Sequence, residues 1–111
     1  MEIGEAKSGG TLVMTPTGRL NAESAQAFQE RLLSRIDAGE TSLLLDLAQL
    51  DYISSAGLRS LLIAAKRVQA SDGRFALCAL TANVREVFRM SGFDTIIDVH
   101  PDRATALRSF A

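Results

Sequence analysis

The sequence predicts an α/β fold, with a small mixed and mostly parallel sheet packed with about four helices. Two observations carry this prediction. Short apolar runs, such as residues 42–47, alternate along the chain with stretches whose apolar residues recur at helical spacing. Strand–helix–strand units of this length favour parallel neighbours joined by right-handed crossovers. The 111 residues have the size of one ordinary domain, expected to span residues 1–111, and 47% of them are hydrophobic.

The N-terminal part of the chain is typical of a hairpin followed by a helix. Two strands, residues 3–7 and 11–15, flank a turn at Ser8–Gly10, and the second strand is rich in β-forming residues. A helix follows, for which Asn21 or Ser24 is the expected cap. The apolar residues that recur along it at helical spacing are Ala25, Phe28, Leu32 and Ile36.

The middle of the chain indicates two buried strands around a long helix. Residues 42–47 show no polar alternation until Asp46, which is typical of a strand buried on both faces. The helix is expected from about Ser55 to about Ala70, and residues 75–80 form the next buried strand. The expected inner stripe of this helix consists of Leu58, Leu61, Leu62, Ala65 and Val68.

The C-terminal part predicts two more helices with a strand between them. A helix after Thr81 ends at Gly92, the expected left-handed cap, and Phe93 folds back onto that helix end. Residues 96–99 are expected to form a short strand, and a terminal helix starts at Pro101–Asp102. The apolar side of this last helix holds Ala106, Leu107 and Phe110.

Composition excludes several classes of partner. With 12 Lys and Arg against 13 Asp and Glu, the formal net charge of −1 offers no basic patch for nucleic acid or an acidic membrane. Cys78 lies in an apolar run and is expected to be a buried core residue rather than a reactive thiol. No apolar stretch is long enough to span a membrane, and the N-terminus lacks the features of a signal peptide. We expect a cytoplasmic protein that is a monomer when free.

The inventory of reactive side chains does not indicate an enzyme. The single histidine, His100, has no cysteine, histidine or carboxylate at metal-ligand spacing, so neither a metal nor a cofactor is expected. The chain contains the residue types of a catalytic triad, with Ser55, His100 and an aspartate. The serine, however, lacks the G-x-S-x-G elbow that exposes a nucleophile. A hydrolase therefore stays only as an alternative.

The stretch from Asp46 to Leu58 carries two adjacent hydroxyls, Ser54 and Ser55, where an apolar strand gives way to a helix. Serines at such a corner are mostly helix caps, because their oxygen accepts unpaired N–H groups of the first turn. The positive helix end also tolerates an anion, so a hydroxyl here can carry a phosphate. The residues expected on the outward side of the helix are Arg59, Ile63 and Lys66, a candidate partner surface.

Three stretches resemble the STAS domain family of anti-sigma factor antagonists. The most specific is residues 43–58, in which Leu50-Asp-Tyr-Ile-Ser-Ser-Ala-Gly-Leu58 follows the apolar strand. Gly18–Asn21 is similar to the family's segment before the first helix, and Val84–Phe93 to its third helix and cap. The resemblance covers nearly the whole chain in the right order.

The resemblance implies a partner switch without enzymatic activity. In the family, the unmodified domain binds an anti-sigma factor that is also a serine kinase, and this frees the sigma factor. Phosphorylation of one serine at the start of the second helix releases the domain, and a PP2C-type phosphatase restores it. Alignment on Gly57 and Leu58 puts Ser55 at the phosphoacceptor position. The implied partner-binding residues are Asn21, Ser54, Ser55, Ala56, Gly57, Arg59, Ile63 and Lys66.

The chain departs from the family pattern at three of these positions. Ser54 replaces an acidic residue and becomes a rival phosphoacceptor, whereas Ala56 replaces a second hydroxyl and removes another acceptor. Asn21 stands where many members have aspartate. Two further alternatives stay open. One is an unphosphorylated accessory subunit of a transporter or signalling assembly, and the other is a nucleotide-binding or small-ligand module built around Asp46, Asn21 and Ser55.

Overall fold

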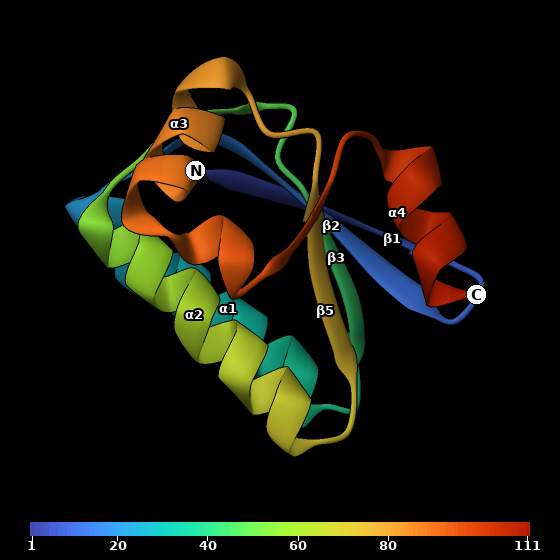
Figure 1. Cartoon of the computed structure of the whole chain (residues 1–111). Helices are drawn as coiled ribbons and strands as arrows, with labels where there is room; N and C mark the ends of the chain where they lie inside the picture. The colour runs from blue at the N-terminus through green and yellow to red at the C-terminus, as the bar shows by residue number, and fades with distance from the viewer.

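The computed structural model describes residues 1–111 as one sheet with helices on both faces (Figure 1). The strands are β1 (Glu2–Ser8), β2 (Thr11–Leu20), β3 (Ser42–Asp46), β4 (Leu50–Ile53), β5 (Arg74–Cys78) and β6 (Asp98–His100). The helices are α1 (Ala22–Asp37), α2 (Ser55–Ala70), α3 (Ala82–Ser91) and α4 (Arg103–Phe110), with a 3₁₀ turn η1 at Phe93–Thr95.

The sheet is mixed and mostly parallel, as the sequence predicts. Its order is β1-β2-β3-β5-β6, and β4 pairs with the far end of β2. Only β1 runs antiparallel to its neighbour, in the expected hairpin with β2. The pairs β2–β3, β2–β4, β3–β5 and β5–β6 are all parallel. The predicted α/β architecture with four helices is therefore confirmed.

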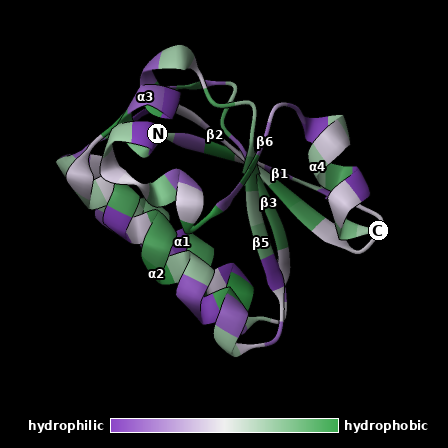
Figure 2. Cartoon of the chain, in the orientation of Figure 1, coloured by the Kyte–Doolittle hydropathy of each residue, from purple (hydrophilic) through white to green (hydrophobic).

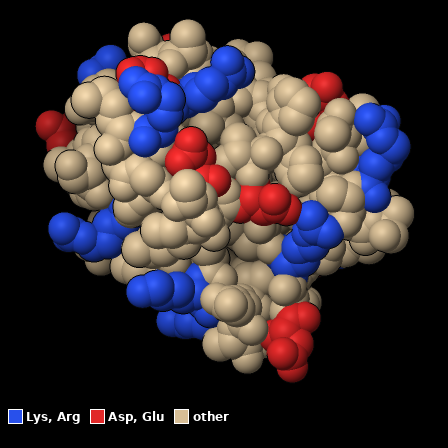
Figure 3. Space-filling model, in the orientation of Figure 1, with Lys and Arg blue, Asp and Glu red and all other residues tan.

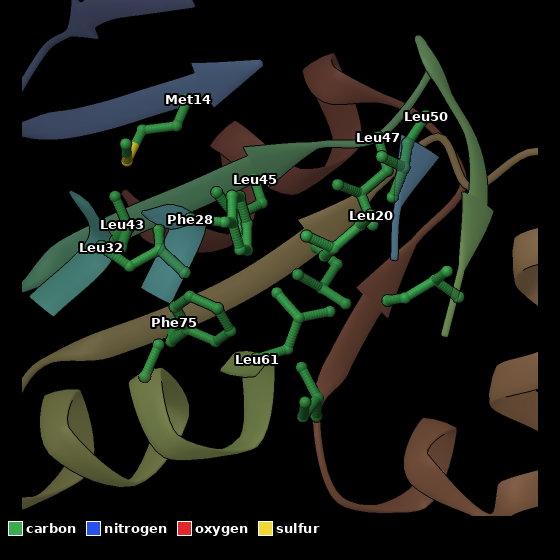
Figure 4. Close-up of a cluster of buried hydrophobic side chains, with 14 of the residues drawn as sticks. Met14, Leu20, Phe28, Leu32, Leu43, Leu45, Leu47, Leu50, Leu61 and Phe75 are labelled. Carbon is green, nitrogen blue, oxygen red and sulfur yellow. The ribbon is translucent and has the colours of Figure 1, made fainter. Parts of the chain in front are cut away.

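The strand period of two divides the core into two layers. Leu43 and Leu45 point to the face covered by α1, α2 and α3, where Phe28, Leu61 and Phe75 join them in the main cluster (Figure 4). Leu44 points to the opposite face, where Cys78 and α4 form the smaller cluster. The prediction that this strand is buried on both faces is confirmed. In Figure 2 hydrophobic residues lie along the central strands, and the helices carry both hydrophobic and hydrophilic residues.

The strands differ from the prediction in two places. Residues 50–53, for which no strand was expected, form β4, because the backbone of β2 continues past β3 and pairs with them. The last strand is not residues 96–99 but Asp98–His100. Its start is delayed because the chain first closes η1, where the Ile97 N–H donates to the Phe93 carbonyl at 2.9 Å. Ile96 is consequently exposed rather than in the strand.

The buried side of α2 is also rotated relative to the expected stripe. Leu62 and Ala65 are only half-buried, whereas Ser60 and Ala64 are buried. The reason is that α1 lies alongside α2, and the Ser60 hydroxyl donates to the Ala25 carbonyl of α1 at 3.2 Å. The sequence gives no direct sign of this helix–helix contact, because serine is neutral in a hydropathy pattern.

Candidate functional site

The serine corner, defined as residues 54–57, is built on the parallel pair β2–β4. Leu20 at the end of β2 lies opposite Ile53 at the end of β4, and the Ser54 N–H donates to the Leu20 carbonyl at 2.8 Å. Each strand is followed directly by a helix, α1 after β2 and α2 after β4. The pairing therefore brings two helix N-termini, at Asn21 and Ser54, to the same edge of the sheet.

Both N-termini are capped by side chains. The Asn21 Oδ1 accepts from the backbone N–H groups of Glu23 and Ser24, at 3.0 and 3.1 Å. The Ser24 hydroxyl oxygen accepts from the Asn21 N–H at 3.0 Å and completes a capping box, so both predicted capping residues take part. On α2, the Ser54 Oγ accepts from the Gly57 N–H at 3.2 Å.

The two adjacent serines are in different environments. Ser54 is half-buried, and its hydroxyl is occupied by the cap. Ser55 is the first residue of α2 and is exposed, and its hydroxyl takes part in no hydrogen bond of the structure. Of the two rival phosphoacceptors, Ser55 is therefore the one whose oxygen is free and open to solvent.

Ala56 and Gly57 form the floor of the corner. Ala56 is half-buried and packs against the main core, and Gly57 is buried. A Cβ on Gly57 would lie 2.8 Å from the Leu20 Cγ and 2.9 Å from the Ile53 Cγ1, so no side chain fits there. This glycine lets the first turn of α2 rest directly on the ends of β2 and β4. The corner is consequently held against the sheet on its inner side, and Ser55 lies on its solvent-exposed side.

The predicted outward residues of α2 lie on one side of the helix, with unequal exposure. Arg59 and Lys66 are exposed and make no ion pair, and Ile63 between them is half-buried. Figure 3 shows basic side chains along the side of the molecule where α1 and α2 run. A second feature, which the sequence analysis missed, is Tyr52 on β4, 38% exposed, with the Arg19 guanidinium 4.3 Å from its ring centre.

Asp46 does not join Asn21 and Ser55. Its carboxylate is buried on the α4 side of the sheet, where it accepts from the Arg103 Nε at 2.9 Å and from the Ala48 N–H at 3.0 Å. The small-ligand site proposed from these three residues is therefore wrong about Asp46. Successive side chains of a strand point to opposite faces of the sheet, so Asp46 lies on the same face as Leu44, two residues earlier. That face is opposite to the one covered by α1 and α2.

The hydrolase triad is not assembled either. The His100 Nε2 lies 3.3 Å from the Asp98 Oδ2 and 3.4 Å from the Ser109 Oγ, so it interacts with β6 and α4 and not with Ser55. His100 and Ser55 belong to elements at different parts of the sheet, and the alternative of a Ser55–His100 pair is wrong. No group of three or more His, Cys, Asp or Glu side chains is arranged to hold a metal ion.

A surface hollow lies beside the corner and does not include it. It has a volume of about 1000 Å³ and lies between the β-hairpin and α1. Arg19 and Asn21 border it, but Ser54 and Ser55 do not. The exposed serine therefore lies on an open surface, which suits access by a protein partner. None of the helices combines the length and the hydropathy that crossing a membrane requires.

Comparisons with known proteins bear on the family of this chain. The family model described as the STAS domain matches residues 5–106. A candidate anti-sigma factor antagonist of Bordetella bronchiseptica, BtrV, is 40% identical over 110 residues, which cover 99% of this chain and 95% of BtrV. The chain therefore has a relative of nearly the same length and substantial identity.

Solved structures show the same fold. A candidate anti-sigma factor antagonist of Thermotoga maritima superposes with a TM-score of 0.93 at 21% identity, covering 97% of this chain and 93% of that one. The phosphorylated form of the Bacillus cell fate determinant SpoIIAA has a TM-score of 0.75 at 19% identity, covering 99% of this chain and 100% of that one. With the family model and BtrV matching nearly throughout, the chain belongs to the STAS domain family.

Proposed function

We propose that this protein is an anti-sigma factor antagonist that is controlled by phosphorylation at Ser55. In its unmodified form it binds a serine-kinase anti-sigma factor in the cytoplasm, and this frees the sigma factor. The observation that carries the proposal is the exposed, unbonded hydroxyl of Ser55 beside the capping Ser54. The 40% identity to BtrV, a candidate antagonist of nearly the same length, supports the same role.

The chemistry of the switch is a phosphoryl transfer. The Ser55 oxygen bonds to the γ-phosphorus of ATP on the kinase, the bond to ADP breaks, and the hydroxyl proton passes to a base on the kinase. A PP2C-type phosphatase reverses the modification with water, which returns the hydroxyl and releases inorganic phosphate. The domain itself supplies the acceptor oxygen and its position, so we propose no catalytic residue in this chain.

The physical logic follows from the place of Ser55 in α2. A phosphate adds about −1.5 to −2 charges at neutral pH, which the positive end of a helix tolerates. The modification therefore costs the domain little stability. In an interface packed around residues 54–57 and the outward side of α2, the same charge is crowded and partly desolvated. Such misplaced charge costs several kcal/mol across an interface, and each ~1.4 kcal/mol lowers affinity about tenfold.

The first test is peptide-resolved mass spectrometry of the protein isolated from its own cells. Phosphate on Ser55 supports the proposal. Phosphate on Ser54 would keep the switch but move the acceptor by one residue. A well-covered peptide without phosphate under several growth conditions would contradict the proposal and favour an unmodified accessory subunit.

The second test measures affinity for the purified kinase by calorimetry. We expect Ser55→Asp to weaken binding at least tenfold, which is about 1.4 kcal/mol, and Ser55→Ala to bind as the parent does. Gln69→Asp, which adds the same charge at an exposed position near the far end of α2, is the control and should bind as the parent does. Equal binding by the parent and by Ser55→Asp would show that this residue does not control the complex.

A further inference from the structure

We propose that Arg59 is the partner of phosphorylated Ser55 within α2, and that the phosphate withdraws this cation from the binding surface. The inference rests on the phosphorylation proposed above and adds a second action to it. The modification places negative charge at the corner, and it also removes a positive charge that the unmodified protein offers to its partner.

The spacing of the two residues sets the geometry. Ser55 is the first residue of α2 and Arg59 follows four positions later, within an uninterrupted helix that reaches Ala70. Residues at i and i+4 face each other on a helix, with Cβ atoms about 5–6 Å apart. An acidic group on the N-terminal side of a basic one is also the favourable orientation. A phosphate on Ser55 is therefore within reach of the Arg59 guanidinium.

Arg59 is the one arginine of the chain that has no partner in the unmodified structure. Every other arginine is engaged. Arg31, Arg35, Arg67, Arg74, Arg89 and Arg103 form ion pairs. Arg19 lies over the Tyr52 ring, and Arg85 and Arg108 donate to oxygens. No hydrogen bond, ion pair or ring contact involves Arg59, which is exposed. Its charge is thus unused in the folded domain.

The other charged groups near the corner cannot take the place of Arg59 as the partner of the phosphate. Glu23 in the first turn of α1 and Asp51 on β4 are negative and repel a phosphate. The Arg19 guanidinium is held 4.3 Å from the Tyr52 ring centre. Lys66 is eleven residues along α2 from Ser55, a rise of about 16 Å, which is beyond side-chain reach. Among the charged groups of α1, β2, β4 and α2, Arg19 is therefore the rival cation that needs a control.

The test uses the full chain with phosphoserine installed at position 55 by genetic encoding. The measured quantity is the pKa of the second ionisation of the phosphate, obtained from the ³¹P NMR chemical shift as a function of pH. An i,i+4 ion pair lowers that measured pKa by about 0.3 in the parent relative to Arg59→Gln. Arg59→Lys should restore part of the difference. Arg19→Gln is the matched control and should titrate as the parent does.

Two results would overturn the proposal. One is the same phosphate pKa in the parent and in Arg59→Gln, and the other is a shift in Arg19→Gln in place of Arg59→Gln. Far-UV circular dichroism of each variant checks that α2 is intact. This experiment needs no kinase, so its failure leaves the switch at Ser55 standing. Conversely, cells that never phosphorylate Ser55 would refute the proposed function without changing the titration.

Discussion

Ser54 and Ser55 are neighbours with the same side chain, and they differ in what their oxygens contact. The Ser54 Oγ accepts from the Gly57 N–H at 3.2 Å, and the Ser55 hydroxyl has no partner. A capping serine contributes about 1 kcal/mol to stability, because without it a backbone N–H of the first turn loses its acceptor. An exposed hydroxyl without a partner contributes close to nothing.

We therefore expect Ser54→Ala to lower the free energy of unfolding by about 1 kcal/mol and Ser55→Ala to change it by less than about 0.5 kcal/mol. Urea unfolding followed by circular dichroism measures both values. Asn21→Ala, which removes the cap of α1, is the matched control and should resemble Ser54→Ala. Equal losses for the two serines would mean that the hydroxyl of Ser55 also supports the fold.

The individual residues of the site were predictable from the sequence only in part. The sequence motif identified the two serines, and the structure shows that Ser54 caps α2, a helix start that the pattern predicts from residue type. The role of Ser55 stays a prediction. Two features were not predictable. The partnership of Asp46 with Arg103 joins residues 57 positions apart, and the Arg19–Tyr52 stack depends on the β2–β4 register.

Among the elements, α4 is the only helix on its face of the sheet. It covers Val13, Leu44, Ala76 and Cys78 with its own Ala106. The ion pair between Arg103 and the buried Asp46 ties the first turn of α4 to the end of β3. A helix of eight residues is too short to be stable alone, so these contacts hold it in place.

The reactivity of the Cys78 thiol measures whether α4 is packed on the sheet. Burial raises its pKa to about 12, and the charge of Asp46 adds to the effect while Arg103 opposes it. The native thiol is therefore protonated and shielded at pH 8, and it reacts with a disulfide reagent only after the helix opens. We expect slow labelling by Ellman's reagent in the parent. Labelling should be about fivefold faster in Arg103→Ala, because this variant loses an ion pair worth ~1 kcal/mol, of which the Arg103 side chain is about half exposed.

Arg67→Ala is the control for this labelling experiment. It removes a comparable exposed pair, Arg67 with Asp37, which joins α1 and α2 on the other face. Opening of α4 should be unaffected by that change. Labelling of Cys78 at the rate of an unfolded cysteine in the parent would contradict its burial under α4.

Most elements were predictable because each has a local cause. The apolar run of β3, the spacing in α1 and the αL conformation of Gly92 at the end of α3 all follow from residue type and order. The missed element, β4, has only four residues, two of them exposed. It exists because β2 is ten residues long and offers a free edge beyond β3. That condition depends on the paired strand and not on the segment itself.

In the whole molecule, the two faces of the sheet are stabilised differently, and only one of them leads to the serine corner. The face under α1, α2 and α3 contains the larger core and ends at the serine corner. The face under α4 is secured by polar contacts at its rim. There Arg74 on β5 pairs with Asp98 at 2.7 Å, donates to the Ser109 carbonyl and lies 5.0 Å from the Phe110 ring centre. Loss of this rim is expected to reduce stability without changing the corner.

The Asp98 carboxyl makes this rim sensitive to acid. The hydrogen bond from Arg74, and secondarily His100, holds the pKa of Asp98 below its ordinary value of 3.8. The folded state therefore keeps Asp98 ionised to lower pH than the unfolded chain does. Its contribution to stability is present above about pH 4 and is lost as the pH falls through the lower folded-state pKa. Because the side chain is about half exposed, this contribution stays below about 1 kcal/mol.

We expect the free energy of unfolding of Asp98→Asn to depend less steeply on pH than that of the parent, between about pH 4 and pH 2. Urea titrations at a series of pH values measure this slope. Arg74→Gln should flatten it in the same way, since it removes the main cause of the lowered pKa. Some slope must persist in both variants, because Glu40, Glu86 and Asp102 also have lowered pKa values. An unchanged slope in Asp98→Asn would mean that its ion pair with Arg74 does not persist in solution.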